Sequence, residues 1–132
     1  YHGPRNDLPD GYNPKAVIEM LNGIKNELLC VRGNCDTEVD QMVLDFPIMA
    51  DYAIVADGER MIYLTHGHKY GVDYFPGAKA GDIVIQGHTH IPMNEKRNGV
   101  WCVNPGSVSL PKNGSKHQCL IYDNGEFETV EL

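Results

Sequence analysis

The stretch Val84-Ile85-Gln86-Gly87-His88-Thr89-His90-Ile91-Pro92 is the starting point for assigning a fold to this 132-residue chain. Its β-branched beginning, together with Ile83, is typical of a short buried strand, which Gly87 ends. His88 and His90 then stand two positions apart, so a loop leaving a sheet can direct both imidazoles into one cleft. Because imidazole is the commonest metal-binding side chain, the stretch predicts metal ligands at a strand end. Surface histidines also share this spacing by accident, so the rest of the chain must decide.

Two further segments have the same form, an apolar strand followed by glycine and polar residues that can bind metals. They are Arg32-Gly33-Asn34-Cys35-Asp36, which follows the apolar run 28–31, and Leu64-Thr65-His66-Gly67-His68, which ends the apolar run 60–65. Loops at the carboxyl ends of neighbouring strands form binding crevices in α/β sheets. The three segments therefore predict one shared site at the carboxyl edge of a sheet.

The remaining elements indicate an α/β class with much antiparallel or mixed sheet. Asn13-Pro14 predicts the start of a helix, with Asn13 as the N-cap. Apolar residues at helical spacing extend this helix over about 14–26. Further expected elements are a strand over 28–31, a helical turn over 38–44, strands over 52–56 and 60–65 joined at Asp57-Gly58, a polar connection over 69–80 with at most one helical turn, strands over 82–86 and 100–104, and a hairpin of 118–122 with 127–132.

Composition limits the compartments and partners that the chain can have. A net charge of -7 and a pI near 5.2 argue against nucleic acid or a membrane surface bound by bulk charge. No run approaches the roughly 18 apolar residues of a membrane span. The cysteines form no C-x-x-C pair, and Cys30 and Cys102 lie in apolar runs, so reduced core thiols and a cytoplasmic location are expected.

The candidate ligands are Asn34, His66, His88 and His90. Imidazole nitrogen suits manganese, iron, nickel or zinc, whereas amide oxygen suits the harder of these ions. A set without thiolates is unlike a structural zinc site and fits a catalytic site with open positions. Two metal ions bridged by a water would serve an in-line displacement at phosphorus.

The chain contains three motifs in the order Gly33-Asn34-x-Asp36, Thr65-His66-Gly67-His68 and Gly87-His88-x-His90. Together they resemble the calcineurin-like metallophosphoesterase superfamily, and its YfcE-type phosphodiesterases in particular. The resemblance covers nearly the whole chain and includes Gly3-Pro4 and 104–107. It implies a two-layer β sandwich flanked by helices. It also implies two divalent ions, commonly Mn²⁺, and hydrolysis of phosphate esters by a metal-bridging hydroxide, with a small phosphate ester as the substrate.

The resemblance also assigns roles to individual residues. Asn34, His66 and His88 match ligands of one metal, and Asn34 can also touch the substrate phosphate. His90 matches a ligand of the other metal. Cys35 stands where many relatives have histidine and is a candidate proton donor to the leaving group, although a thiol is poorer for this work near neutral pH. The implied catalytic residues are thus Asn34, Cys35 and His90.

Two ligand motifs of the superfamily, an Asp-x-His and a Gly-Asp with a metal-bridging aspartate, are not found ahead of Asn34. Residues 1–132 are therefore expected to be a single metallophosphoesterase domain without its N-terminal β-α-β part. Alone they should bind metal weakly and be inactive, and unpaired strand edges could lead to homo-oligomers. The alternative function is a non-catalytic scaffold or interaction subunit of the same fold. Scaffolds tend to lose ligands by substitution, whereas all four matchable positions here carry ligand-type side chains.

Overall fold

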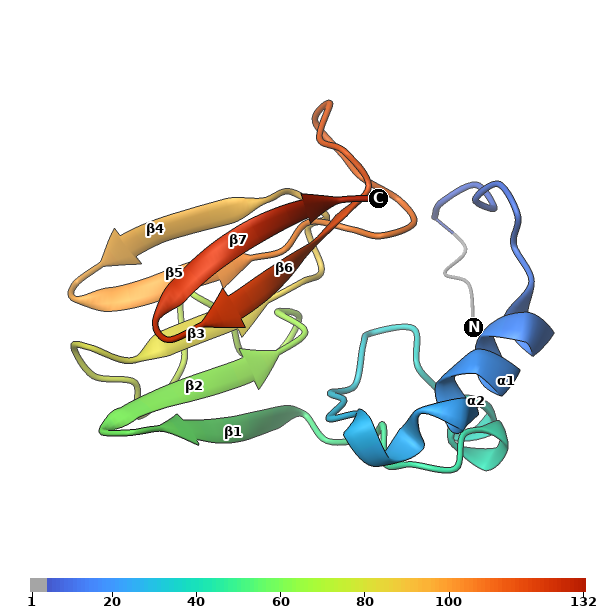
Figure 1. The fold of residues 1–132 in the computed structure, drawn as a ribbon, viewed down its shortest axis with the longest axis horizontal. Helices are drawn as coiled ribbons and strands as arrows, with labels where there is room; N and C mark the ends of the chain where they lie inside the picture. Colours follow the sequence, from blue (N-terminus) through green and yellow to red (C-terminus); the bar gives the residue numbers. More distant parts are fainter. Residues whose placement is uncertain (1–4) are drawn as a thin grey trace.

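The computed structural model describes residues 5–132, and a five-stranded mixed sheet forms its centre. The strands lie in the order β1-β2-β3-β5-β4 (Figure 1). Their bounds are β1 Tyr52–Asp57, β2 Arg60–Thr65, β3 Ile83–Gln86, β4 Met93–Arg97 and β5 Val100–Asn104. The three inner strands β2, β3 and β5 run parallel, so their carboxyl ends meet at one edge of the sheet.

Each outer strand of this sheet is joined to an inner one by a tight hairpin. β1 pairs antiparallel with β2, and β4 with β5. Asp57 pairs with Arg60, so the first turn consists of Gly58 and Glu59, one position later than the predicted Asp57-Gly58. The second turn is Asn98-Gly99, and both of its residues have positive φ angles of 51° and 84°. Such angles suit the right-handed twist of two-residue hairpins.

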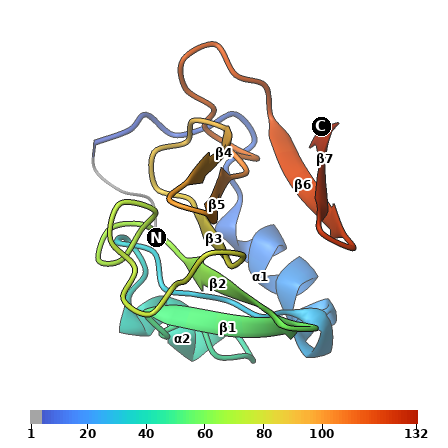
Figure 2. The same cartoon turned by 90° about the vertical axis from the view of Figure 1, so that its left-hand side faces the viewer.

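A second layer lies on one face of the sheet. It is the antiparallel hairpin of β6, Gln118–Asp123, and β7, Glu126–Glu131. Figure 2 shows this hairpin standing to one side of the five-stranded sheet. Ile62, Ile83 and Val103 form the buried core, and Leu64, Ile85, Leu120, Tyr122 and Phe127 pack against it. These side chains come from the inner strands of the sheet and from the hairpin, so burial of apolar surface holds the two layers together.

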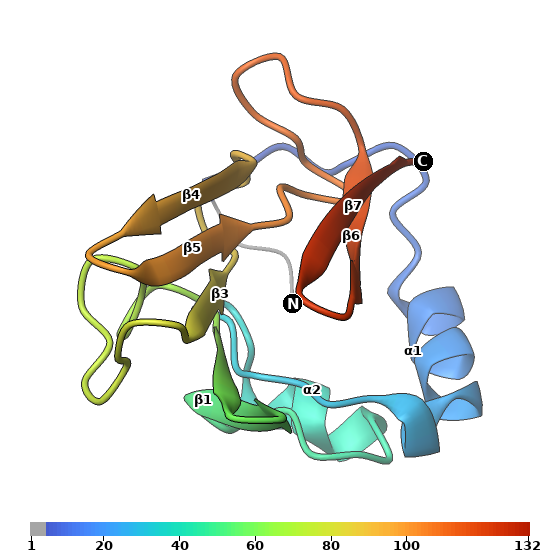
Figure 3. The ribbon, with the colours of Figure 1, turned by 60° about the vertical axis from the view of Figure 1, so that its left-hand side comes forward.

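The helices are few and flank the sheet, as the fold prediction requires. They are α1 Pro14–Gly23, the 3₁₀ turn η1 Lys25–Glu27 and α2 Glu38–Val43, which lie away from β4 (Figure 3). The Asn13 side chain caps α1 by accepting a 3.2 Å hydrogen bond from the Ala16 amide. The helix ends earlier than the predicted residue 26 because the chain tightens into η1. None of the helices in residues 5–132 has the length and apolar character needed to cross a membrane.

The predicted strand over 28–31 is wrong. This segment is not hydrogen-bonded into either sheet, and Leu29 is 58% exposed. Just after it, the Arg32 amide donates to the Ala50 carbonyl over 2.7 Å. An apolar run becomes a strand only beside a partner with which to form a ladder, and no strand of residues 5–132 pairs with this segment. The polar strand β4 was not predicted, because its sequence MNEKR lacks the apolar alternation of a half-buried strand.

One polar cluster links the two layers. The Tyr122 hydroxyl donates a hydrogen bond to the Asp57 carboxylate and accepts one of 3.1 Å from Arg60. Tyr122 belongs to β6, whereas Asp57 and Arg60 flank the β1–β2 turn. The hydrogen bond to Asp57 raises the pKa of Tyr122 above its usual 10.0.

Replacing Tyr122 with phenylalanine should therefore lower the free energy of unfolding at pH 8 by about 1 kcal/mol, the usual value of one such bond. Because the folded state raises the pKa of Tyr122, it binds the phenolic proton more tightly than the unfolded chain does. The stabilisation that comes from this difference in pKa is fully present below pH 10 and is lost as the pH rises through the pKa of Tyr122 in the folded state. Urea unfolding at pH 8 and pH 10.5 should show a smaller difference between the two proteins at the higher pH. A difference that grows with pH would contradict this linkage.

Candidate metal centre

The loop that follows residues 28–31 is shaped by Asp36. Its carboxylate accepts a 2.6 Å hydrogen bond from the Gly33 amide, and the Asp36 amide donates to the Gly33 carbonyl over 3.3 Å. A Cβ atom on Gly33 would lie 3.0 Å from this carboxylate and 3.6 Å from Cε1 of His66. Glycine therefore lets the loop close against both groups, and the closed loop presents Asn34 toward the end of β2.

The loop after β2 is held by side chains of the two strands beneath it. The Thr65 hydroxyl donates to the Tyr70 carbonyl over 2.8 Å, and the side-chain oxygen of Gln86 accepts a 2.9 Å bond from the Val72 amide. A Cβ atom on Gly71 would lie 2.4 Å from that Gln86 oxygen. Since Thr65 and Gln86 are paired across β2 and β3, both strands fix the segment that carries His66 and His68.

The loop after β3 has an uncommon backbone conformation. His88 and His90 have positive φ angles of 66° and 62°, a region that residues with side chains rarely adopt. Asn104, at the end of β5, holds this conformation because its side chain donates to the Gly87 carbonyl over 2.8 Å and to the Thr89 hydroxyl over 3.0 Å. Observed strain of this kind clusters at functional sites.

These loops bring three of the predicted ligands together. Nε2 of His66 lies 2.7 Å from Oδ1 of Asn34, and Nδ1 of His88 lies 3.2 Å from each of those two atoms. We call these residues the Asn34–His66–His88 trio. Two ligand atoms at right angles around an ion about 2.1 Å away are separated by about 3 Å. The spacing of the three atoms therefore fits neighbouring ligands on one face of a single metal ion.

The trio contains one asparagine and two histidines, and it lacks a thiolate. Within residues 5–132, no group of three or more His, Cys, Asp and Glu side chains is placed to hold a metal ion. The amide oxygen of Asn34 thus supplies the third ligand atom of this candidate centre. A set of two imidazole nitrogens and one amide oxygen suits a divalent ion of intermediate hardness.

The charge state of His66 favours its binding to a metal ion. Burial, and next the neighbouring His88 and His68, lower the pKa of His66 from 6.5 to about 4. Its ring is therefore neutral near pH 7, the form in which a ring nitrogen can bind a metal.

His90 lies apart from the trio. Nδ1 of its ring is 2.7 Å from the Leu110 carbonyl, an arrangement in which Nδ1 carries the proton and donates it. Nε2 is then the nitrogen with a free lone pair. His90 is close enough for its charge to act on the pKa of His66. Hydrogen bonds to backbone carbonyls commonly orient metal-binding histidines in this way.

Cys35 lies next to Asn34 at the candidate centre. Nδ2 of the Asn34 amide donates a hydrogen bond to the Cys35 sulfur over 3.5 Å, an ordinary length for a sulfur acceptor. Cys35 is partly exposed and forms no disulfide. The structure therefore places the thiol beside the trio without assigning it a role.

The remaining motif predictions have separate outcomes. Gly3-Pro4 lies outside the described residues. The sequence does contain one Gly-Asp pair, Gly81-Asp82, at the start of β3. The Asp82 carboxylate is buried and accepts hydrogen bonds from the Met61 and Lys79 amides. It therefore stabilises the end of the sheet opposite to His88.

Sequence reasoning missed the supporting side chains of this centre. The sequence predicts Asn104 only as the end of the strand over 100–104 and Gln86 only as the end of the strand over 82–86. The signal for both was their position, since each ends a parallel strand beside a candidate ligand loop.

His68 has a buried Nδ1 atom without a hydrogen-bond partner, and its ring lies 5.2 Å from that of His66.

Known proteins resemble this chain in sequence and in fold. Residues 8–126 match the calcineurin-like phosphoesterase superfamily domain. The chain is 44% identical to the phosphodiesterase YfcE of Escherichia coli over 99% of its own length and 71% of that protein. It is 34% identical to the probable metallophosphoesterase YsnB of Bacillus subtilis over 62% of its own length and 48% of that protein.

Solved structures agree with this relationship. The structure of YfcE, a phosphoesterase from E. coli, superposes with a TM-score of 0.90 and 46% identity, covering 93% of this chain and 68% of that one. An archaeal phosphodiesterase at 24% identity shares the fold with a TM-score of 0.66, covering 89% of this chain and 76% of that one. The chain belongs to the calcineurin-like phosphoesterase superfamily. Membership in this metallophosphoesterase family implies divalent metal ions.

Proposed function

We propose that this chain belongs to a metal-dependent phosphodiesterase that acts on small or nucleotide-like phosphate esters. The observation that carries this proposal is the convergence of the Asn34–His66–His88 trio, whose three ligand atoms lie within 3.2 Å of one another. The phosphodiesterase YfcE of E. coli, at 44% identity, supports the reaction type.

Each residue of the trio has a defined task in this proposal. His66 and His88 present ring nitrogens, and Asn34 presents Oδ1 while its NH₂ group remains able to donate a hydrogen bond to a phosphoryl oxygen. His90 would use Nε2 toward a second ion, since Nδ1 faces the Leu110 carbonyl. When bound, two such ions would polarise the phosphoryl group and lower the pKa of the attacking water.

Cys35 is the proposed proton donor to the leaving group. Its sulfur lies 3.5 Å from Nδ2 of Asn34 and is thus beside the position that the substrate phosphate would occupy. A thiol can donate a proton but is a poor general acid for this step near neutral pH. The enzyme should consequently prefer esters with good leaving groups.

Manganese is the proposed metal. Nitrogen and amide oxygen ligands without thiolate suit Mn²⁺ better than ions that prefer sulfur. The net charge of -7 argues against a long nucleic acid held by bulk electrostatics and so favours small phosphate esters as substrates. A scaffold function is the alternative, and the presence of ligand-type side chains at positions 34, 66, 88 and 90 favours the enzyme.

The test is hydrolysis of bis-p-nitrophenyl phosphate by metal-stripped protein to which Mn²⁺, Mg²⁺ or Zn²⁺ is returned. Residues 1–132 and the full-length gene product should be assayed side by side, because the chain covers 71% of its E. coli relative. We expect turnover in the full-length protein that EDTA abolishes and Mn²⁺ restores best. Bound metal without turnover in that protein would favour the scaffold. Equal activity of residues 1–132 alone would show that the trio and His90 suffice.

A further inference from the structure

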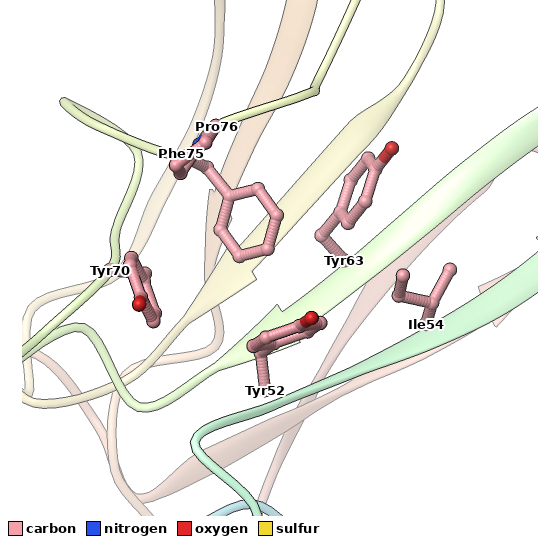
Figure 4. Close-up of a pocket in the computed structure, with 6 residues that line it drawn as sticks. All are labelled: Tyr52, Ile54, Tyr63, Tyr70, Phe75 and Pro76. Carbon is pink, nitrogen blue, oxygen red and sulfur yellow. The ribbon is translucent and has the colours of Figure 1, made fainter.

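A pocket lined by aromatic rings opens beside the candidate metal centre, on β1, β2 and the loop that follows β2. It has a volume of about 320 Å³ and is lined by Tyr52, Ile54, Tyr63, Tyr70, Phe75 and Pro76 (Figure 4). Small-molecule sites commonly occupy concave, largely apolar pockets of this size. The Asn34–His66–His88 trio contributes nothing to its lining, so it is a separate feature.

The rings of the pocket form a connected cluster. Phe75 lies at its centre, with ring centroids 5.7 Å from Tyr52, 4.6 Å from Tyr63 and 5.9 Å from Tyr70. Tyr52 and Tyr70 also meet edge to face at 6.0 Å. These separations lie within the range in which aromatic rings attract one another. The pocket walls are therefore preformed rings that can receive another flat ring.

The pocket lies close to the trio along the chain and across the sheet. Tyr52 is paired with Thr65, the residue directly before His66. Residues paired in this way have Cα atoms about 5 Å apart, and one peptide adds 3.8 Å. Tyr70 is tied to the same residue, since its carbonyl accepts the 2.8 Å hydrogen bond from the Thr65 hydroxyl. Two walls of the pocket thus stand at the strand end from which His66 leaves.

Only part of the pocket is open to solvent. Tyr63 is buried, and its hydroxyl donates to the Gly77 carbonyl over 3.3 Å, which closes the far wall. Tyr52 is 47% exposed at the near wall. A flat ligand would enter past Tyr52 and Tyr70 and bury its ring against Phe75, while its polar end stayed toward the strand end.

We propose that this pocket binds the aromatic group, a nucleobase or an aryl ring, of the phosphate ester whose phosphoryl group is held at the trio. The inference rests on the proposed phosphodiesterase function and adds a substrate class to it. Specificity for aromatic esters then comes from Tyr52, Tyr70 and Phe75, and the metal centre acts on the phosphate alone.

The experiment compares two ligands that differ only in the base, adenosine 5′-monophosphate and ribose 5-phosphate. Their binding to the full-length protein is measured by calorimetry, and contacts of the base protons by saturation-transfer NMR. We expect the base to improve affinity about tenfold, within the usual range for stacking of a base on aromatic side chains. Tyr52→Ala and Tyr70→Ala should each remove most of this advantage. The control is Tyr74→Ala, since Tyr74 lies in the same loop, is 68% exposed and does not line the pocket.

The outcomes separate this inference from the proposed function. Equal affinities for the two ligands, or an advantage of the base that survives both tyrosine variants, would overturn the aromatic pocket even if Mn²⁺-dependent turnover is found. A base advantage that both variants remove would support the pocket even if the protein hydrolyses no ester. Loss of the base advantage in Tyr74→Ala as well would place the effect in the loop as a whole and overturn the assignment to the pocket.

Discussion

Replacing His66 with alanine should lower the affinity of the full-length protein for Mn²⁺ by more than 100-fold and abolish its hydrolysis of bis-p-nitrophenyl phosphate. Loss of a hydrogen-bond partner behind a metal ligand already reduces affinity or activity by roughly 10- to 100-fold, and loss of the ligand itself should do more. His66 holds the central place in the trio, with Nε2 at 2.7 Å from Asn34 and 3.2 Å from His88. Its pKa, lowered to about 4, also keeps the ring neutral near pH 7, so protons compete little with a metal ion for this nitrogen.

The matched control is His117→Ala. His117 is exposed and its ring faces the Val108 carbonyl at 2.9 Å, away from the trio. This variant should bind Mn²⁺ and turn over substrate as the unaltered protein does. Urea unfolding in EDTA should show that His66→Ala remains folded. Mn²⁺ affinity within threefold of normal in His66→Ala would show that the metal binds elsewhere.

Replacing Asn104 with alanine should destabilise the fold by about 3–5 kcal/mol. The Asn104 side chain is 2% exposed, donates to the Gly87 carbonyl and the Thr89 hydroxyl, and accepts a 2.9 Å bond from the Gly106 amide. Alanine removes the bonds to the Gly87 carbonyl and the Thr89 hydroxyl, which keep the Thr89 and Ile91 amides as partners, at a cost of about 1 kcal/mol each. It also leaves the Gly106 amide without its partner, which costs about 1–3 kcal/mol. The measurement is the free energy of unfolding in urea.

Asn94→Ala provides the control, because Asn94 is exposed on β4 and its substitution should change stability by less than about 0.5 kcal/mol. A second readout concerns the site. Asn104 holds the backbone between His88 and His90, both at positive φ, so its loss should also weaken Mn²⁺ binding under conditions in which the variant is still folded. A loss of less than 1 kcal/mol would show that water replaces the amide.

The strand ends that carry the candidate ligands could be predicted because their signals are local. The runs before His66 and His88 are largely apolar, and each has a glycine next to its histidine, Gly67 after His66 and Gly87 before His88. The strands and the loops after them therefore follow from sequence pattern. Asn34 was predicted at the site as well, but its supposed strand over 28–31 is not formed. Strand formation depends on a partner elsewhere, which local pattern does not contain.

The supports of the site depend on tertiary contacts and were not predicted. Asn104 is 15 residues from Thr89 and 17 from Gly87, and Gln86 reaches Val72 across 14 residues. No periodicity reveals which amide side chain will meet which loop. The aromatic pocket is a similar case, since it joins two strands with a loop that the sequence showed only as a polar connection.

The parallel pairing at the centre of the sheet sets the order in which this protein can fold. The three hairpins, β1–β2, β4–β5 and β6–β7, join neighbouring strands and can form on the microsecond scale. The ladders β2–β3 and β3–β5 need the segments 66–82 and 87–99 to close first, and such non-local pairing is slow. The Asn34–His66–His88 trio joins residues 22, 32 and 54 positions apart, and His66 and His88 follow the two strands of the β2–β3 ladder, so we expect the trio to assemble after that ladder. The metal-binding geometry should then form late, and the hairpins that precede it expose their edges in the meantime.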